Sequence, residues 1–146
     1  MGAVVHRPGE GERLEVGPST LVLHATSDDT GGTLFLSEST IAPGFPGPPP
    51  HTHETLHDMF FVLDGTLTVQ LEGETLDAGP GTFVCVPPGT VHTFSNTSDA
   101  PVRFLNFNTP GGFESYMREL ADALKDGPVT RDAIGKIASK YDFKPA

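Results

Sequence analysis

The sequence predicts an all-β protein, a sandwich or barrel of short antiparallel strands followed by two helices. Between residues 19 and 107, short apolar runs alternate with turn residues, as is typical of antiparallel sandwiches and barrels. After residue 112 the apolar spacing changes to the period of amphipathic helices. A chain of 146 residues with 36% hydrophobic residues is long enough to bury one core. We therefore expect a single domain over residues 1–146, with a β core at about 19–108 and a helical tail at about 111–141.

Apolar runs bounded by turn residues mark the expected strands. They cover residues 20–24, 33–41, 59–63, 66–71, 83–86, 91–94 and 101–107. Between the third and fourth, Asp64-Gly65 predicts a tight hairpin turn, because glycine tolerates a positive φ. Residues 42–50 contain five prolines, which have no N–H to donate to a neighbouring strand. We expect this segment to be extended but unpaired, and to deliver His51 to a fixed place.

Two amphipathic helices are expected in the tail. The apolar positions of the first are Phe113, Tyr116, Met117, Leu120 and Leu124, which follow i, i+3, i+4, i+7, i+11 spacing. The second helix runs from Thr130 to about Lys140, with Ile134, Ile137 and Ala138 on its apolar face. We expect both helices to pack on the outside of the β domain, with their apolar residues serving as core.

Composition restricts the possible partners. Nine basic residues against 19 acidic ones give a net charge of −10, which repels phosphate backbones and anionic lipids, so neither nucleic acid nor a membrane is expected as a partner. Residues 1–13 lack the apolar core of a signal peptide, and no apolar run reaches the ~20 residues of a membrane span. These features favour a soluble cytoplasmic protein. The single cysteine, Cys85, lies in an apolar run and is expected to be buried and inert.

Four of the six histidines lie in two short segments, residues 51–58 and 81–96. His51 and His53 are two residues apart, so in an extended segment their side chains point to the same side. His92 follows the turn Pro87-Pro88-Gly89 on another expected strand, and a barrel could bring it beside the first pair. Neutral imidazole is the commonest protein metal ligand, and the acidic Asp58 lies close by in the sequence. The pattern therefore indicates a metal site.

At these residues the sequence resembles the cupin superfamily. The second segment matches the second cupin motif at Gly81, Pro87, Gly89, His92 and Asn96. The first segment matches the first motif at His51, His53, Gly65 and, at its acidic position, Asp58. Two departures are visible: Asp58 stands where the family usually has Glu, and Phe45 replaces an expected glycine. The resemblance covers residues 33–108, and the helical tail resembles that of small bacterial cupins similar to quercetin dioxygenase.

The resemblance implies a jelly-roll β-barrel with a divalent metal bound by His51, His53, Asp58 and His92. This ligand set suits Fe, Mn, Ni, Cu or Zn, and ligand type alone does not choose among them. Because Asp is one methylene shorter than Glu, two roles are open for Asp58. It either binds the ion directly, or lies outside the coordination sphere and orients a ligand or a water. His57, next to Asp58, is expected to point the opposite way by strand alternation. If residues 54–57 form a loop instead, His57 becomes an alternative ligand.

Apolar residues flank the expected site on both faces of the strand that follows it. Phe60 and Val62 share a face with Asp58, and with Phe94 they either line a substrate pocket or fill the barrel core. The alternate positions Met59, Phe61 and Leu63 are also apolar. They favour a homodimer, unless the C-terminal helices cover them.

Three functions follow from these residues and the resemblance. The first is a metal-dependent oxidoreductase, a dioxygenase of a small enolisable or aromatic substrate, with Asp58 accepting the substrate proton. The second is a metal-dependent isomerase or cyclase that polarises a carbonyl of a polyketide-like or sugar-like substrate without using O2. The third is a non-catalytic cupin that binds a small molecule.

Overall fold

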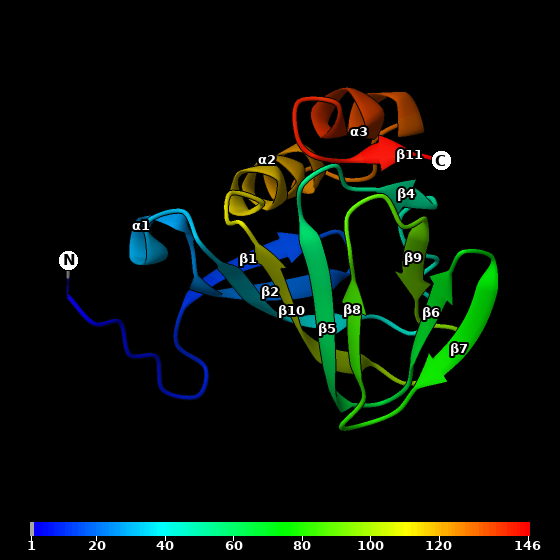
Figure 1. The fold of residues 1–146 in the computed structure, drawn as a ribbon, viewed down its shortest axis with the longest axis horizontal. Helices are drawn as coiled ribbons and strands as arrows, with labels where there is room; N and C mark the ends of the chain where they lie inside the picture. The colour runs from blue at the N-terminus through cyan, green and yellow to red at the C-terminus, as the bar shows by residue number, and fades with distance from the viewer. Residues whose placement is uncertain (1) are drawn as a thin grey trace.

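The computed structural model describes residues 2–146 and consists mainly of two antiparallel β-sheets, with two helices lying across one end of them (Figure 1). The first sheet has the strand order β1-β2-β3-β10-β5-β8 and the second has the order β11-β4-β9-β6-β7. In both sheets, strands that are distant in the sequence are neighbours, such as β3 and β10 or β4 and β11, as in a jelly roll. The fold is a jelly-roll barrel with C-terminal helices, which confirms the predicted class.

The strand bounds follow the predicted pattern closely. The first sheet contains β1 (Glu12–Val16), β2 (Ser19–Ala25), β3 (Phe35–Ile41), β10 (Val102–Thr109), β5 (His57–Asp64) and β8 (Phe83–Val86). The second sheet contains β11 (Lys144–Pro145), β4 (His51–Thr52), β9 (His92–Ser95), β6 (Leu67–Leu71) and β7 (Glu74–Ala78). The proline-rich segment 42–50 carries no strand, as expected.

The main core lies between the two sheets. Strand β3 alternates strictly between buried and half-buried positions, as expected of a strand with one face in a core. The inward residues pack in one cluster that includes Phe60, Val62, Val69, Val102 and Phe104, each at most 1% exposed. This core rigidly holds the strands that carry the histidines.

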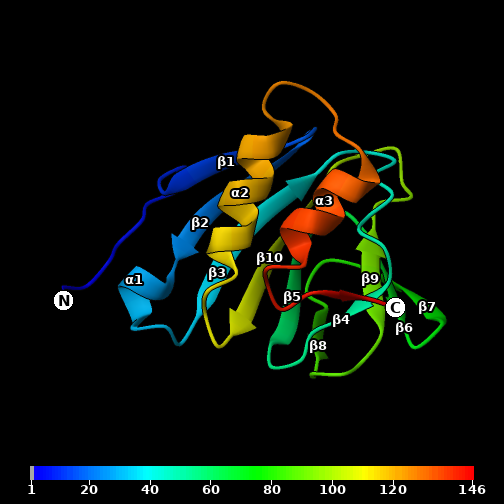
Figure 2. The same ribbon diagram turned by 90° about the horizontal axis from the view of Figure 1, so that it is seen from above.

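Helices α2 (Glu114–Leu124) and α3 (Arg131–Ala138) confirm the two predicted helices. Thr130 caps α3, because its side chain accepts a hydrogen bond from the Ala133 backbone N–H. Helix α2 packs Phe113 and Met117 against a cluster that includes Leu21 and Phe35, on the inward face of β2 and β3. The helices thus lie outside the β domain, over one end of it, as seen from above in Figure 2.

Three predictions about local structure were incomplete or wrong. Strands β1 and β7 and the short helix α1 (Ser27–Thr30) were not expected, because the exposed residues of β1 and β7 are mostly polar, although Leu14 and Val16 of β1 pack against the cluster of Leu21 and Phe35. Gly65 has the predicted positive φ of 81°, but the turn joins β5 to β6, which lie in different sheets, so it is a corner and not a hairpin. Cys85 is exposed, because β8 alternates and buries Val84 and Val86 instead.

Among residues 2–146, no helix is long and apolar enough to cross a membrane.

Candidate metal centre

Three strands from different parts of the sequence bring four ligand-type side chains together. His51 on β4 lies directly opposite His92 on β9 in the second sheet. Asp58 is on β5 of the first sheet, and His53 lies in the loop that leads from β4 to β5. Potential ligand atoms of His51, His53, Asp58 and His92 all lie within 4.8 Å of one another, and all four residues are buried. The four predicted ligands therefore form one cluster inside the barrel.

Each of the three histidine rings is oriented by a backbone carbonyl. The Nδ1–H of His51 donates to Pro49 O at 2.8 Å, and that of His92 donates to Thr90 O at 3.0 Å. The Nδ1–H of His53 donates to the carbonyl of Asp142, far along the chain. These bonds fix the tautomer in which Nε2 carries a free lone pair, which is how metal-binding imidazoles are usually held.

The two oxygens of the Asp58 carboxylate have different partners. Its Oδ1 accepts hydrogen bonds from the amide groups of Asn106 and Asn108, both at 2.8 Å. Its Oδ2 faces Nε2 of His92 at 2.9 Å and Nε2 of His53 at 3.4 Å. The two asparagines therefore hold the short side chain so that one oxygen points at the histidines. This placement supports Asp58 as a fourth ligand through Oδ2.

Burial and neighbouring charges set the protonation of the cluster. Burial lowers the pKa of His51 to about 4, so this imidazole is neutral at pH 7. Burial would raise the pKa of Asp58, but its close contacts with the imidazoles of His53 and His92 outweigh that effect and lower it. Burial likewise disfavours the charged form of His53, yet the nearby Asp58 carboxylate and the hydrogen bond to the Asp142 carbonyl raise its pKa. An ionised Asp58 among three imidazoles is a set of groups that attracts a cation.

A buried nitrogen without a partner shows that the cluster fits a metal ion. Within residues 2–146, the Nε2 of His53 is buried and has no hydrogen-bond partner, although a buried polar atom without one is costly. A divalent ion bound by the three imidazole nitrogens and Asp58 Oδ2 would satisfy it. The donor set, three neutral nitrogens and one carboxylate, matches the preference of first-row transition metals and zinc.

The cluster lies at the wall of a large cavity of about 1300 Å³. His51, His53 and Asp58 contribute to the lining, and most of the rest is apolar. Strands β3 and β10 supply Ile41 and Phe104, and helices α2 and α3 supply residues such as Leu120 and Ile134. This volume exceeds the ~300–1,000 Å³ of common ligand sites. An ion in the cluster would therefore face a roomy, mostly apolar chamber.

The remaining predicted residues separate into wall, core and surface. Phe94 lines the cavity. Phe60 and Val62 are fully buried and belong to the core cluster, outside the cavity lining, so of the two roles that the sequence allows them they have the core role. His57 is exposed at the start of β5, pointing away from Asp58. It is not part of the ligand cluster.

Several residues around the cluster were not singled out from the sequence. Asn106 and Asn108 alternate on β10, and their spacing is a weak signal for a polar pair facing the site. Phe143 stacks on the His51 ring with centroids 4.2 Å apart, and Phe113 contacts the edge of His53. Asp142 and Phe143 follow the last helix, and no local pattern in the sequence connects them to histidines some 90 residues earlier.

Comparison with known proteins agrees with this architecture. The pattern of the cupin domain family matches residues 37–108. Quercetin 2,3-dioxygenase of Bacillus subtilis is 32% identical over 123 residues, which cover 83% of this chain but only 36% of that enzyme. This chain thus spans about a third of the length of that relative.

Solved structures give the same fold. KdgF from Halomonas sp. superimposes with a TM-score of 0.65 over 79% of this chain and 98% of that one, at 20% identity. The polyketide cyclase RemF from Streptomyces resistomycificus superimposes with a TM-score of 0.61 over 75% of this chain and 80% of that one, at 27% identity.

The jelly-roll barrel, with three histidines and an aspartate buried together on its inner wall, defines a class of small barrel proteins with a candidate divalent-metal site. The matched family and the relatives place the chain within that class. It belongs to the cupin superfamily, and it is a small cupin similar to quercetinase-like proteins.

Proposed function

We propose that this cupin is a metal-dependent oxidoreductase, a dioxygenase that acts on a small enolisable or aromatic substrate. The observation that carries the proposal is the oriented cluster of three histidines and one aspartate at the wall of an apolar cavity. The similarity to a quercetin dioxygenase supports the reaction class. When bound, a divalent transition metal would supply Lewis acidity and a site at which an oxygen-bearing substrate and O2 meet.

The residues around the cluster would have separate roles in binding the ion and the substrate. His51, His53 and His92 would hold the ion through Nε2, since each Nδ1–H is already bonded to a carbonyl. The apolar wall, including Phe94 and Phe104, would exclude water from a flat substrate. Asn106, which lines the cavity beside Asp58, already donates its side-chain amide to Asp58 and to Met59 O, so its Oδ1 would accept a hydrogen bond from a substrate hydroxyl.

Asp58 can accept a substrate proton only at Oδ2, because Oδ1 already accepts two amide N–H groups. Its lowered pKa also makes it a weak base. Asp58 would therefore serve mainly as the fourth metal ligand. It would accept a substrate proton only when Oδ2 turns away from the ion and toward the substrate.

Oxygen consumption tests the proposal directly. Metal-free protein would be reloaded separately with Fe(II), Mn(II), Ni(II), Cu(II) or Zn(II), and O2 uptake measured with a panel of flavonols, phenols and β-diketones. We expect substrate-dependent uptake with at least one redox-active metal, none with zinc, and none in a His92→Ala variant. His57→Ala is the matched control, because His57 lies outside the cluster. Absence of uptake with every metal and substrate would reject the dioxygenase.

An isomerase or cyclase is the second candidate, favoured by the similarity to the polyketide cyclase RemF. The apolar cavity suits a polyketide-like substrate better than a sugar-like one, because a sugar needs many polar partners. Turnover under nitrogen, with zinc as effective as iron, would support this candidate. Tight binding without turnover under either atmosphere would instead identify a binding protein.

We also propose that the chain forms a homodimer through the outer face of the first sheet. Phe61 is 36% exposed and Phe83 is 53% exposed on the adjacent strands β5 and β8. Phe83 stacks on Phe107 of β10, which extends the apolar surface. The helices lie over one end of the sheets and not over the strands β5 and β8 that carry these two residues (Figure 1). A contiguous apolar surface of this kind is typical of an association site.

A further inference from the structure

The segment that follows helix α3, residues 141–146, lies across the loop and strand that carry two of the candidate metal ligands. We call it the strap. Its strand β11 pairs with β4, so that Pro145 lies opposite His51, and the Ala146 backbone N–H donates to Pro50 O at 2.8 Å. The strap therefore runs beside the proposed site although it is distant in sequence.

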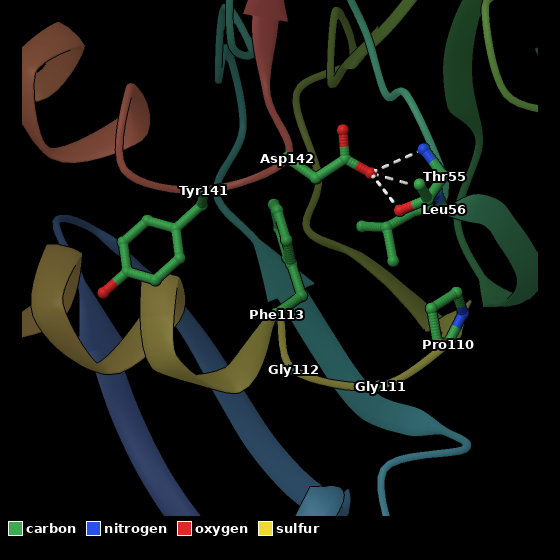
Figure 3. A pocket seen from close by; sticks show the side chains of 8 residues that line it. All are labelled: Thr55, Leu56, Pro110, Gly111, Gly112, Phe113, Tyr141 and Asp142. Atoms are coloured by element: carbon green, nitrogen blue, oxygen red, sulfur yellow. Dashed lines mark hydrogen bonds between the residues drawn. The ribbon is translucent and has the colours of Figure 1, made fainter.

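Asp142 of the strap binds the loop that follows His53. Its Oδ2 accepts hydrogen bonds from the backbone N–H groups of Thr55 at 2.9 Å and Leu56 at 3.0 Å, and from the Thr55 hydroxyl at 2.9 Å. Its Oδ1 accepts from the Glu54 backbone N–H. Figure 3 shows this carboxylate aimed at Thr55 and Leu56, above Phe113. One side chain thus satisfies three successive backbone donors and fixes the conformation of residues 54–56.

The same residue orients a ligand through its backbone. The Asp142 carbonyl accepts the Nδ1–H of His53, so the carboxylate holds the loop while the carbonyl sets the direction of the ring. Phe143, the next residue, stacks on His51 with an interplanar angle of 19° and contacts the edge of His53. The side chain of Phe143 is only 8% exposed. Two consecutive strap residues therefore contact both members of the His51/His53 pair.

The barrel itself gives this pair little support. Asp58 and His92 belong to strands paired with neighbours on both sides, whereas β4 has only two residues and a single register pair with β9. The prolines before β4 have no N–H for a ladder, and residues 53–56 carry no strand. Without the strap, the positions of His51 and His53 would depend on this short strand and on the Gly89 N–H, which donates to the His53 carbonyl at 2.9 Å.

We infer that Asp142 and Phe143 are positioning residues of the metal centre, and that the strap sets its affinity for metal by holding His51 and His53 in their ligand geometry. This inference rests on the proposed metal site. Removing an outer partner of a ligand commonly weakens metal binding by about 10–100-fold. Linkage requires the reverse effect as well, so a bound ion would stabilise the strap.

Cobalt binding provides the test, because Co(II) reports both affinity and ligand geometry through its visible absorption. We expect Asp142→Ala, Asp142→Asn and Phe143→Leu to bind Co(II) at least about tenfold more weakly than the parent, with an altered spectrum. Phe143→Tyr keeps the ring and should restore the parent spectrum. Lys136→Ala is the control, because Lys136 is an exposed residue of α3 outside the strap. Folded variants with the parent affinity and spectrum would overturn the inference.

Hydrogen exchange in the metal-free protein separates this inference from the proposed function. We expect the amide protons of Thr55 and Leu56 to be protected in the parent and unprotected in Asp142→Ala. If the parent binds no Co(II), the metal proposal fails. The hydrogen bonds between Asp142 and residues 54–56, which we call the Asp142 clamp, are still measured. Equal protection in parent and variant would refute the clamp. If Asp142→Ala does not fold, Co(II) binding and hydrogen exchange are measured on Asp142→Asn and Phe143→Leu.

Discussion

Asp58 Oδ2 lies 2.9 Å from His92 Nε2, and this contact joins the two sheets of the barrel at the candidate metal centre. The two residues are 34 positions apart and come from the two different segments that first suggested a metal. Their neighbours explain the geometry, since Asn106 and Asn108 hold Asp58 and the Thr90 carbonyl holds His92. The contact leads to predictions about ligands, support and pH.

Replacement of the ligands should remove the metal. We expect His51→Ala and His92→Ala to retain less than about a tenth of the parent's bound metal after dialysis, because each removes one of four donors from the cluster. Elemental analysis of purified protein measures this. His57→Ala should retain the parent amount, since His57 is exposed on the opposite side of β5. Loss of metal in His57→Ala would show that the ligand set is different.

The asparagine support of Asp58 should also affect metal affinity. In Asn108→Ala, one of two donors to Oδ1 is lost at a residue only 1% exposed, so Asp58 becomes less firmly oriented. We expect about tenfold weaker binding of Co(II), measured by competition with a chelator. Thr75→Ala is the control, because Thr75 is exposed on β7, away from the cluster. Unchanged affinity in Asn108→Ala would mean that Asn106 alone suffices.

Acidification should release the metal by protonating histidine. The pKa of His53 is raised above its usual 6.5, so protons begin to compete with the ion at or above that pH, whereas His51, with a pKa of about 4, stays neutral. We therefore expect the apparent affinity for Co(II) to fall steadily from about pH 8 to about pH 6. Titrations at a series of pH values measure this. An affinity independent of pH over that interval would contradict the assignment of His53 as a ligand.

The Asp142 clamp predicts a specific dependence of stability on pH. Burial would raise the pKa of Asp142, but hydrogen bonds from residues 54–56 outweigh it and lower the pKa below 3.8. A carboxyl group with a lowered folded-state pKa stabilises the fold above its unfolded pKa, and that contribution disappears as pH falls through the folded pKa. The stability difference between the parent and Asp142→Asn should be full above about pH 5 and shrink below about pH 4. Urea unfolding of the metal-free proteins at about pH 7 and about pH 3 tests it, and an equal difference at both would exclude the charge as its cause.

Disruption of the outer apolar face should separate the proposed dimer. We expect Phe61→Lys to change the molar mass in solution from that of two chains to that of one, because a charge would be buried at the contact. Light scattering coupled to size-exclusion chromatography measures the mass. Leu76→Lys is a control matched in exposure, since Leu76 is 37% exposed on β7 of the other sheet. A parent protein with the mass of a single chain would reject the dimer.

The class of fold and the residues of the candidate site could be predicted from local patterns in the amino-acid sequence. Alternating apolar runs, the helical period after residue 112 and the spacing of His51, His53 and His92 are local patterns, and each is visible in one segment. The fold and the family comparison confirm the predicted barrel, and the four predicted ligands do lie together. Local alternation also oriented His57 toward solvent, where the structure has it.

The surroundings of these residues depend on contacts between distant parts of the chain, which local patterns do not contain. Alternation could not tell that Cys85 faces out, because Phe83 to Val86 are all apolar and only the packing of β8 on the core selects a face. Nor could it tell that Asp64-Gly65 turns a corner between sheets, since a tight turn has the same residues in either case. Asp142 and Phe143 reach the histidines only because α2 and α3 fold back across the barrel and return the chain to β4, and contacts across such a distance leave no pattern in the sequence.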